Sequence, residues 1–169
     1  AESPDPETFV RAVLDVLRTH GMAERSTLQS FDWGLLKIAQ RLAPEQALSF
    51  LSAQLPRFNT LAGGEWTAGL DLKQHEDAPA LVAAAGGRLW SPHFNDLSQA
   101  VLQRARAEGL RVIPWTVNET SDMERLIDWG VDGLITDYPD RLRGVMQQRG
   151  MGLPPVLEPA MAARARPVS

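Results

Sequence analysis

The sequence has 169 residues, of which 44% are hydrophobic and 22% are charged, with a formal net charge of −4. This is the length and composition of about one globular domain. Lysine and arginine are not in excess, which argues against a nucleic-acid-binding surface, and no apolar run approaches the roughly 20 residues that a membrane-spanning helix needs.

The first half of the chain begins with helix signals and continues with strand signals. Asp5, Pro6 and Glu7 favour a helix that ends near Gly21. A short strand is expected within residues 25–31. Asp32 then caps a second helix, which ends before Pro44. Residues 47–53 are apolar enough for a buried strand, although a helical turn fits nearly as well.

Residues 54–74 are the least regular part of the sequence. Pro56 and three glycines interrupt them, and Trp66 and Leu70 are the apolar anchors. A loop of this length within a domain is often functional. A helix over residues 78–85 follows and ends at Gly86-Gly87, and residues 88–91 read as a strand.

The last part of the chain repeats the same alternation. It predicts a helix over 96–108, a strand over 110–117, a helix from the cap Ser121 to Gly130, a strand over 131–136 and a helix over 140–148. The Pro-, Ala- and Arg-rich residues 150–169 are expected to form a flexible tail. Residues 1–149 are expected to form the folded part.

Regular alternation of helices with apolar strands predicts an α/β fold with a parallel sheet of about five strands, buried on both faces. In such a sheet, functional sites lie where strands end and helices begin. Polar or aromatic residues occupy four such junctions, at residues 29–32, 91–94, 115–118 and 135–139.

Each residue at these junctions has a structural reading as well as a functional one. Asp32 is better explained as a helix cap than as a catalytic acid. Asp137 either orders its turn or faces the site. His93 follows a proline in a loop, where a single histidine is more often solvated than catalytic. Trp115 is large and carries an N–H that needs a partner, so we expect it to form a wall of a pocket.

The sequence contains no His-x-x-x-His or Cys-x-x-Cys pair, and a hard cation wants several oxygen ligands at one point. Asp137 is the one carboxylate suitably placed. Cysteine is absent altogether, which excludes disulfides and a cysteine nucleophile and leaves the compartment open. No phosphate-binding glycine loop or Ser-His-Asp triad is apparent. We therefore assign no catalytic residue and no metal ligand within this chain.

Several segments, taken in order, resemble one family, the glycerophosphodiester phosphodiesterases. The clearest are Gly109-Leu-Arg-Val-Ile-Pro-Trp-Thr-Val-Asn118 and Gly130-Val-Asp-Gly-Leu-Ile-Thr-Asp-Tyr-Pro139, with Met123-Glu-Arg-Leu-Ile127 between them. Upstream, Gln29-Ser-Phe-Asp32 and Leu89-Trp-Ser-Pro92 resemble two further strands of the family. The resemblance covers residues 1 to about 148.

The resemblance implies a TIM-type (β/α)8 barrel, of which this chain supplies the C-terminal part, about five βα units. It implies metal-dependent hydrolysis of glycerophosphodiesters to glycerol 3-phosphate and an alcohol, with Ca²⁺ or Mg²⁺ neutralising the phosphate and two histidines moving protons. On the family pattern, Ser30, Phe31, Trp115 and Asn118 line the substrate pocket. Thr136 and Asp137 lie where the barrel closes on its first strand.

The chain departs from the family in its catalytic motifs. The His-Arg-Gly strand, the Glu-x-Asp metal pair, the second histidine and the Glu-x-Lys strand do not occur in it. The expected partner is therefore the missing N-terminal half of the barrel, without which the chain would be inactive. The alternatives are a non-catalytic half-barrel used for binding or assembly, and a barrel with different chemistry. The 54–74 loop and the Trp-Ser-Pro strand favour the periplasmic or extracytoplasmic branch of the family.

Overall fold

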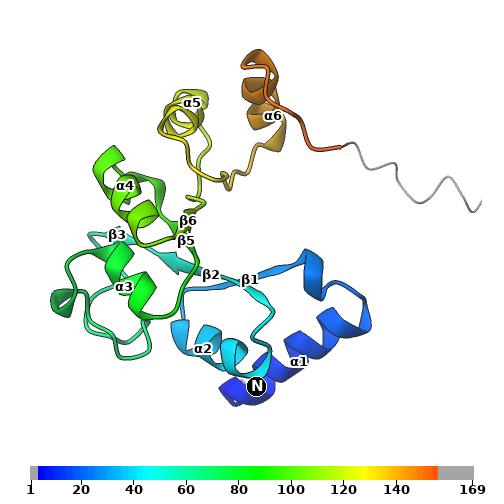
Figure 1. Cartoon of the computed structure of the whole chain (residues 1–169), viewed down its shortest axis with the longest axis vertical. Helices are drawn as coiled ribbons and strands as arrows, with labels where there is room; N and C mark the ends of the chain where they lie inside the picture. The colour runs from blue at the N-terminus through cyan, green and yellow to red at the C-terminus, as the bar shows by residue number, and fades with distance from the viewer. Residues whose placement is uncertain (1–3, 156–169) are drawn as a thin grey trace, which may run out of the picture.

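The computed structural model describes residues 4–155, and a four-stranded parallel sheet of order β1-β2-β5-β6 lies at its centre. The sheet strands are β1 (Thr27–Ser30), β2 (Ala47–Ser52), β5 (Leu89–Pro92) and β6 (Arg111–Val112). The α-helices are α1 (Pro6–Thr19), α2 (Trp33–Leu42), α3 (Ala78–Ala84), α4 (Gln99–Ala107), α5 (Thr120–Trp129) and α6 (Pro139–Gln148). In Figure 1 the helices follow the strands round an arc from α2 to α6.

The predicted alternation of helix and strand is confirmed over the first half of the chain. Asp5 accepts a hydrogen bond from the Thr8 amide at 3.0 Å and so begins α1. Asp32 accepts one from the Gly34 amide at 2.8 Å, which makes it the cap of α2, as the sequence predicts. The segment 47–53 is a strand and not a helical turn, and it pairs with β1 and β5.

The core lies between the sheet and the helices. Its largest fully buried side chains are Trp33, Trp90 and Phe50. The rings of Trp33 and Phe50 meet edge to face at 5.2 Å, and Trp90 Nε1 donates to Ser52 Oγ at 2.8 Å. Gly87 must be glycine, because a β-carbon there would lie 2.5 Å from a methyl carbon of Val82. The apolar strand residues therefore join sheet and helices into one large buried cluster. A second, smaller cluster packs α1 against α2 and consists of Val10, Leu14, Ala39 and Ala43.

The two last predicted strands are corrected by the structure. Residues 110–117 form a regular strand only at Arg111–Val112, and residues 131–136 form none. Pro114 has no N–H to give to a ladder, and the Val112 amide donates to the side chain of Asp132 at 2.8 Å. The two segments still run side by side, since the Ile135 amide donates to Pro114 O at 2.9 Å.

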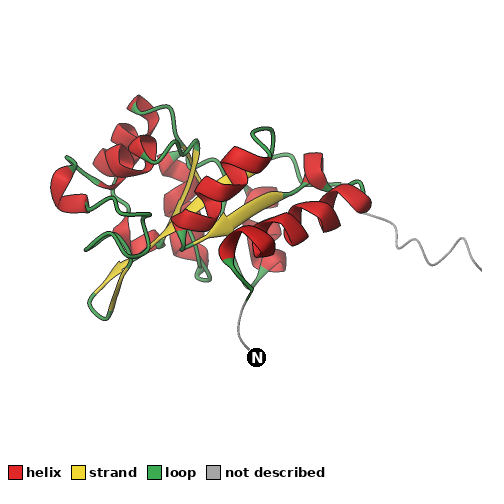
Figure 2. Ribbon diagram, turned by 90° about the horizontal axis from the view of Figure 1, so that it is seen from below, coloured by secondary structure: helices red, strands yellow, loops and turns green. Residues whose placement is uncertain are grey.

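Two predicted helix starts are wrong in detail, and the irregular segment 54–74 contains a short hairpin. The segment 54–74 holds a two-stranded antiparallel hairpin, β3 (Gln54–Leu55) and β4 (Phe58–Asn59), which projects from the body in Figure 2. Helix α4 begins at Gln99 and not at Asp96, because the Ser98 hydroxyl accepts from the Val101 amide. Helix α5 has Glu119 as its N-cap, so Ser121 lies inside the first turn.

The predicted tail, residues 150–169, lies mostly outside the described residues. Residues 151–155 belong to no helix or strand. The Met151 amide donates to Met146 O at 2.9 Å, so the segment begins against the end of α6. The structure does not test the division into residues 1–149 and 150–169, which stays a prediction.

Candidate functional site

The carboxyl ends of the sheet strands bring Phe31 and Trp115 together. Phe31 directly follows β1 and Trp115 lies beyond β6, yet their ring centroids are 5.4 Å apart, edge to face at 85°. The strands β2 and β5 separate β1 from β6 in the sheet. In a flat sheet, three spacings of about 4.8 Å would set the β1 and β6 backbones about 14 Å apart. The two side chains therefore reach toward each other over β2 and β5, along a sheet whose elements follow an arc in Figure 1.

Trp115 is held firmly at this edge. Its Nε1 donates to Ser91 O at 2.8 Å, which satisfies the polar end of the ring. Its backbone amide donates to Pro92 O, and its carbonyl accepts from the Phe94 amide. The indole is half-buried, so part of the ring is left accessible beside Phe31.

Asn118 uses its side chain to join the segment that ends at its own position to the turn that follows residue 136. Its Nδ2 donates to Asp137 Oδ2 at 2.9 Å, and its Oδ1 accepts from the Asp137 amide at 3.0 Å. The Thr136 hydroxyl also donates to Asn118 Oδ1, at 3.2 Å. The amides of the turn after residue 136 are thus held by Asn118 Oδ1 and by the Thr136 hydroxyl, which accepts from the Tyr138 amide at 3.0 Å. The Asp137 carboxylate contacts the Asn118 side chain and not a nearby backbone amide, which was one of the two roles expected for it.

Ser30 lies apart from the aromatic rings. Its hydroxyl accepts from the Asp32 amide at 3.0 Å. It also lines a cavity of about 180 Å³ between α1 and α2, together with Phe9 and Leu35. Ser30, at the end of β1, therefore lines the cavity beside α1 and α2 and hydrogen-bonds the start of α2.

Two exposed aromatic residues, which sequence reasoning did not assign to the site, also belong to it. Phe58, on the β3–β4 hairpin, contacts Phe31 with ring centroids 5.3 Å apart. Trp66 contacts Phe58 at 6.3 Å. The sequence signal that could have found them is two aromatic residues in an irregular segment that follows a strand end.

His93 is more enclosed than the sequence suggested. It is half-buried, and its ring meets Trp115 edge to face at 5.2 Å. Its Nδ1 accepts from the Asn95 amide at 3.3 Å. Nearby, burial raises the pKa of the Asp96 carboxyl, and the hydrogen bond from the Gln54 amide and the electrostatic interaction with His93 oppose the rise.

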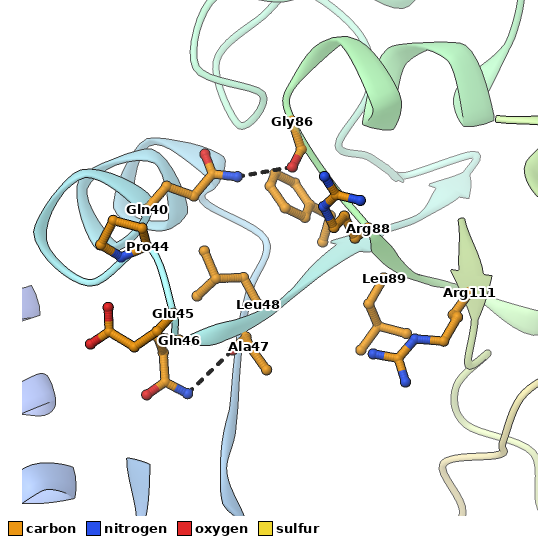
Figure 3. Close-up of a pocket in the computed structure, with 11 residues that line it drawn as sticks. Gln40, Pro44, Glu45, Gln46, Ala47, Leu48, Gly86, Arg88, Leu89 and Arg111 are labelled. Atoms are coloured by element: carbon orange, nitrogen blue, oxygen red, sulfur yellow. Dashed lines mark hydrogen bonds between the residues drawn. The ribbon is translucent and has the colours of Figure 1, made fainter. Parts of the chain in front are cut away.

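A cavity of about 250 Å³ lies at the opposite, amino-terminal ends of the strands (Figure 3). Arg88, Arg111 and Glu45 line it, and in the figure their charged groups point in different directions. No set of polar groups converges there. The carboxyl ends of the strands are therefore the stronger candidate site, as expected for parallel α/β folds.

A divalent metal does not fit the residues described. Within residues 4–155, no group of three or more His, Cys, Asp or Glu side chains is arranged to hold an ion. Asp137, the one carboxylate at a strand end that the sequence offered, is bonded to Asn118. The structure also places no helix within these residues that is long and apolar enough to cross a membrane.

A curved parallel sheet with helices along it and a site at its carboxyl edge defines an α/β protein of the TIM-barrel type. The model of the Glycerophosphoryl diester phosphodiesterase family matches residues 2–141, and the chain belongs to that family. The recognition made from the sequence is thereby confirmed.

Relatives and solved structures agree with this assignment. A glycerophosphodiester phosphodiesterase from Bacillus subtilis is 30% identical over 125 residues, which cover 74% of this chain and 38% of that protein. A structure from Silicibacter pomeroyi, described as a glycerophosphoryl diester phosphodiesterase, has 37% identity and a TM-score of 0.74, and the match covers 88% of this chain and 47% of that one.

A phosphodiesterase from Oleispira antarctica, solved with the product sn-glycerol-3-phosphate, shares the fold at 19% identity and a TM-score of 0.63, over 84% of this chain and 50% of that one. The chain thus spans about half the length, or less, of the relatives described here.

Proposed function

We propose that the protein containing this chain hydrolyses glycerophosphodiesters to glycerol 3-phosphate and an alcohol, and that this chain supplies one wall of the substrate site. The observation that carries the proposal is the meeting of Phe31 and Trp115 across the curved edge of the sheet, in a chain that belongs to this family. Asn118 fixes the adjoining turn through Asp137. Ser30 has a contact of its own with Asp32 and remains the least supported of the predicted pocket residues.

The chain's own residues would bind and orient the substrate. The Phe31 and Trp115 rings exclude water from one side of the site, which strengthens electrostatic interactions there. The catalytic histidines and the ligands of a Ca²⁺ or Mg²⁺ ion would come from residues outside this chain, because the described residues do not supply a metal site.

The chain is proposed to be the C-terminal part of a (β/α)8 barrel. Among residues 4–155, strand β1 pairs with β2 alone, so its other edge carries backbone groups without a strand partner there. Each of the two outer edges of the open sheet, beside β1 and beyond β6, also has an apolar hollow. One, of about 180 Å³, includes Phe9 and Leu28, and the other, of about 310 Å³, includes Leu134 and Met146. An N-terminal half of the barrel would cover both outer edges.

The test is hydrolysis of glycerophosphocholine, with and without added divalent metal, by this chain alone and by the chain joined to an N-terminal segment that carries the His-Arg-Gly and Glu-x-Asp strands. We expect metal-dependent activity from the joined protein and none from the chain alone. Hydrolysis by the chain alone would show that it carries catalytic groups of its own. A joined protein that folds but does not hydrolyse the substrate would favour the non-catalytic half-barrel.

A further inference from the structure

Five aromatic rings form a row that leads outward from the strand ends. It runs from His93 to Trp115, Phe31, Phe58 and Trp66, with successive ring centroids 5.2, 5.4, 5.3 and 6.3 Å apart. The residues come from three separate parts of the sheet edge and from the 54–74 segment. The row therefore extends the proposed substrate site beyond the strand ends.

The outer end of the row is held in place by the backbone. Phe58 pairs with Leu55 in the β3–β4 hairpin. The Thr60 amide donates to Ala53 O at 2.9 Å and closes the base of the hairpin. The carbonyl of Trp66 accepts from the Trp33 amide at 2.8 Å, which ties its loop to the start of α2. The row is thus a built surface and not a set of loose side chains.

Exposure increases along the row. Phe31 and Trp115 are half-buried, whereas Phe58 and Trp66 are each 38% exposed. Figure 2 shows the hairpin that carries Phe58 projecting away from the body of the molecule. Large aromatic side chains that remain exposed next to a site are a common sign of a ligand-binding surface.

The arrangement of the rings suits an alkyl chain better than a cation. Successive rings are nearly perpendicular, at 73° to 85°, so the edge of one ring covers the face of the next. A site for a quaternary ammonium group needs several ring faces turned toward one point. A row of edge-to-face rings instead presents a continuous apolar strip, along which an extended hydrocarbon chain can lose its water.

We infer that the row from Trp115 to Trp66 is a subsite for the alcohol part of the substrate, and that it selects alcohols with an alkyl chain. The inference rests on the proposed function, since it assumes that the phosphodiester binds at the strand ends. The phosphate would lie beside Trp115, and the chain would extend over Phe31 and Phe58 to Trp66. Phe58 and Trp66 are then specificity-determining residues.

The experiment measures binding without turnover. Glycerol alkylphosphonates with ethyl and octyl chains keep the charge of the diester, but their alkyl chain is held by a P–C bond and cannot leave as an alcohol. Their affinities are compared by titration calorimetry, below the concentration at which the octyl compound forms micelles, for the two protein forms used in the hydrolysis assay. Complete burial would strengthen binding about fourfold per methylene, and half-burial on this strip about twofold, so the octyl compound should bind about 60-fold more tightly than the ethyl compound.

Phe58→Ser and Trp66→Ser each remove one exposed ring. We expect either change to weaken octyl binding about tenfold and to leave ethyl binding within about twofold. Val16→Ser is the matched control, because Val16 is an exposed apolar residue on α1, away from the row, and 58% exposed. It should change neither affinity, and circular dichroism should show that all three variants are folded.

Three results would overturn the inference. Equal affinities for the ethyl and octyl compounds would remove the subsite and leave the proposed function standing. A full octyl preference in both ring variants would place the alkyl chain elsewhere. Failure of the joined protein to bind either compound, together with no hydrolysis of glycerophosphocholine, would reject the proposed function and the subsite together.

Discussion

The carboxyl ends and the amino-terminal ends of the sheet strands differ in how their side chains are arranged. At the carboxyl ends, Phe31 and Trp115 follow the two outer strands of the sheet and meet, and Asn118 makes three side-chain hydrogen bonds to the neighbouring turn. At the amino-terminal ends, Arg88 and Arg111 line a cavity of about 250 Å³ without converging. A cavity alone therefore does not mark the site. Side chains that converge from several strands mark it better.

The largest expected effect is a loss of stability of the whole fold, which would disturb the carboxyl and the amino-terminal ends of the strands together. Trp90→Ala removes a fully buried ring between sheet and helices and leaves Ser52 Oγ without its donor. We expect the free energy of unfolding to fall by about 3–5 kcal/mol, as for other large core truncations. Urea denaturation measures it, with the exposed Val16→Ala as control. A fall as small as that of the control would mean that the core does not hold the two ends in place.

Asn118→Ala should damage the carboxyl ends alone. It leaves the Asp137 carboxylate and amide without their partner, which should cost about 1–2 kcal/mol of unfolding free energy and about tenfold in kcat/KM for glycerophosphocholine in the joined protein. Steady-state kinetics and urea denaturation separate the two effects. An unchanged kcat/KM with normal stability would remove Asn118 from the site.

The convergence of the strand ends could be predicted from the sequence, but the contacts of the rings could not. Alternating helix and strand patterns imply a parallel sheet, and such a sheet gathers its carboxyl ends at one edge. Asp32 was identifiable as a cap because its short carboxylate precedes an apolar helical pattern. The positions of Phe58 and Trp66 at the site could not be predicted, because residues 54–74 have no periodicity that indicates which way a side chain points.

Local chemistry also overrode two patterns. The apolar run 110–117 predicts a long strand, but Pro114 interrupts its ladder. The run 131–136 predicts another, but the Asp132 side chain takes the Val112 amide that a strand partner would use. Ser30 shows the same limit at the site, since its position at a strand end did not reveal that its hydroxyl bonds to the Asp32 amide.

A smaller effect is expected in how the stability depends on pH, and it should arise near the carboxyl ends of the strands. Burial raises the pKa of Asp96, beside the hairpin, above its ordinary value of 3.8. The folded state therefore binds the proton more tightly than the unfolded state, so this group lowers the stability as pH rises from below 3.8 through the raised pKa. Asp96→Asn keeps an acceptor for the Gln54 amide and should lose this dependence.

Urea denaturation at a series of pH values around and above 3.8 gives the comparison. Difference curves against the unchanged protein are needed, because the Arg11 and Arg41 side chains lower the pKa of Glu7 and give the opposite slope. A difference that does not vary with pH would mean that Asp96 titrates alike in the folded and unfolded states.

The smallest effect is expected at the amino-terminal ends. Arg88→Ala removes an exposed side chain that lines the cavity in Figure 3. We expect a change of no more than about 0.5 kcal/mol in unfolding free energy, since surface substitutions away from special features have little effect. Thermal or urea denaturation checks this. A loss of several times that size would reveal a structural role for the base of the sheet.

The central claim is that the carboxyl ends of these strands, and not their amino-terminal ends, form a wall of the substrate site. It is tested most directly by kcat/KM for glycerophosphocholine in the joined protein with Trp115→Ala and, separately, Arg111→Ala. We predict a loss of about tenfold or more for Trp115→Ala and no measurable change for Arg111→Ala. Unchanged kinetics for Trp115→Ala, or a larger loss for Arg111→Ala, would contradict the account.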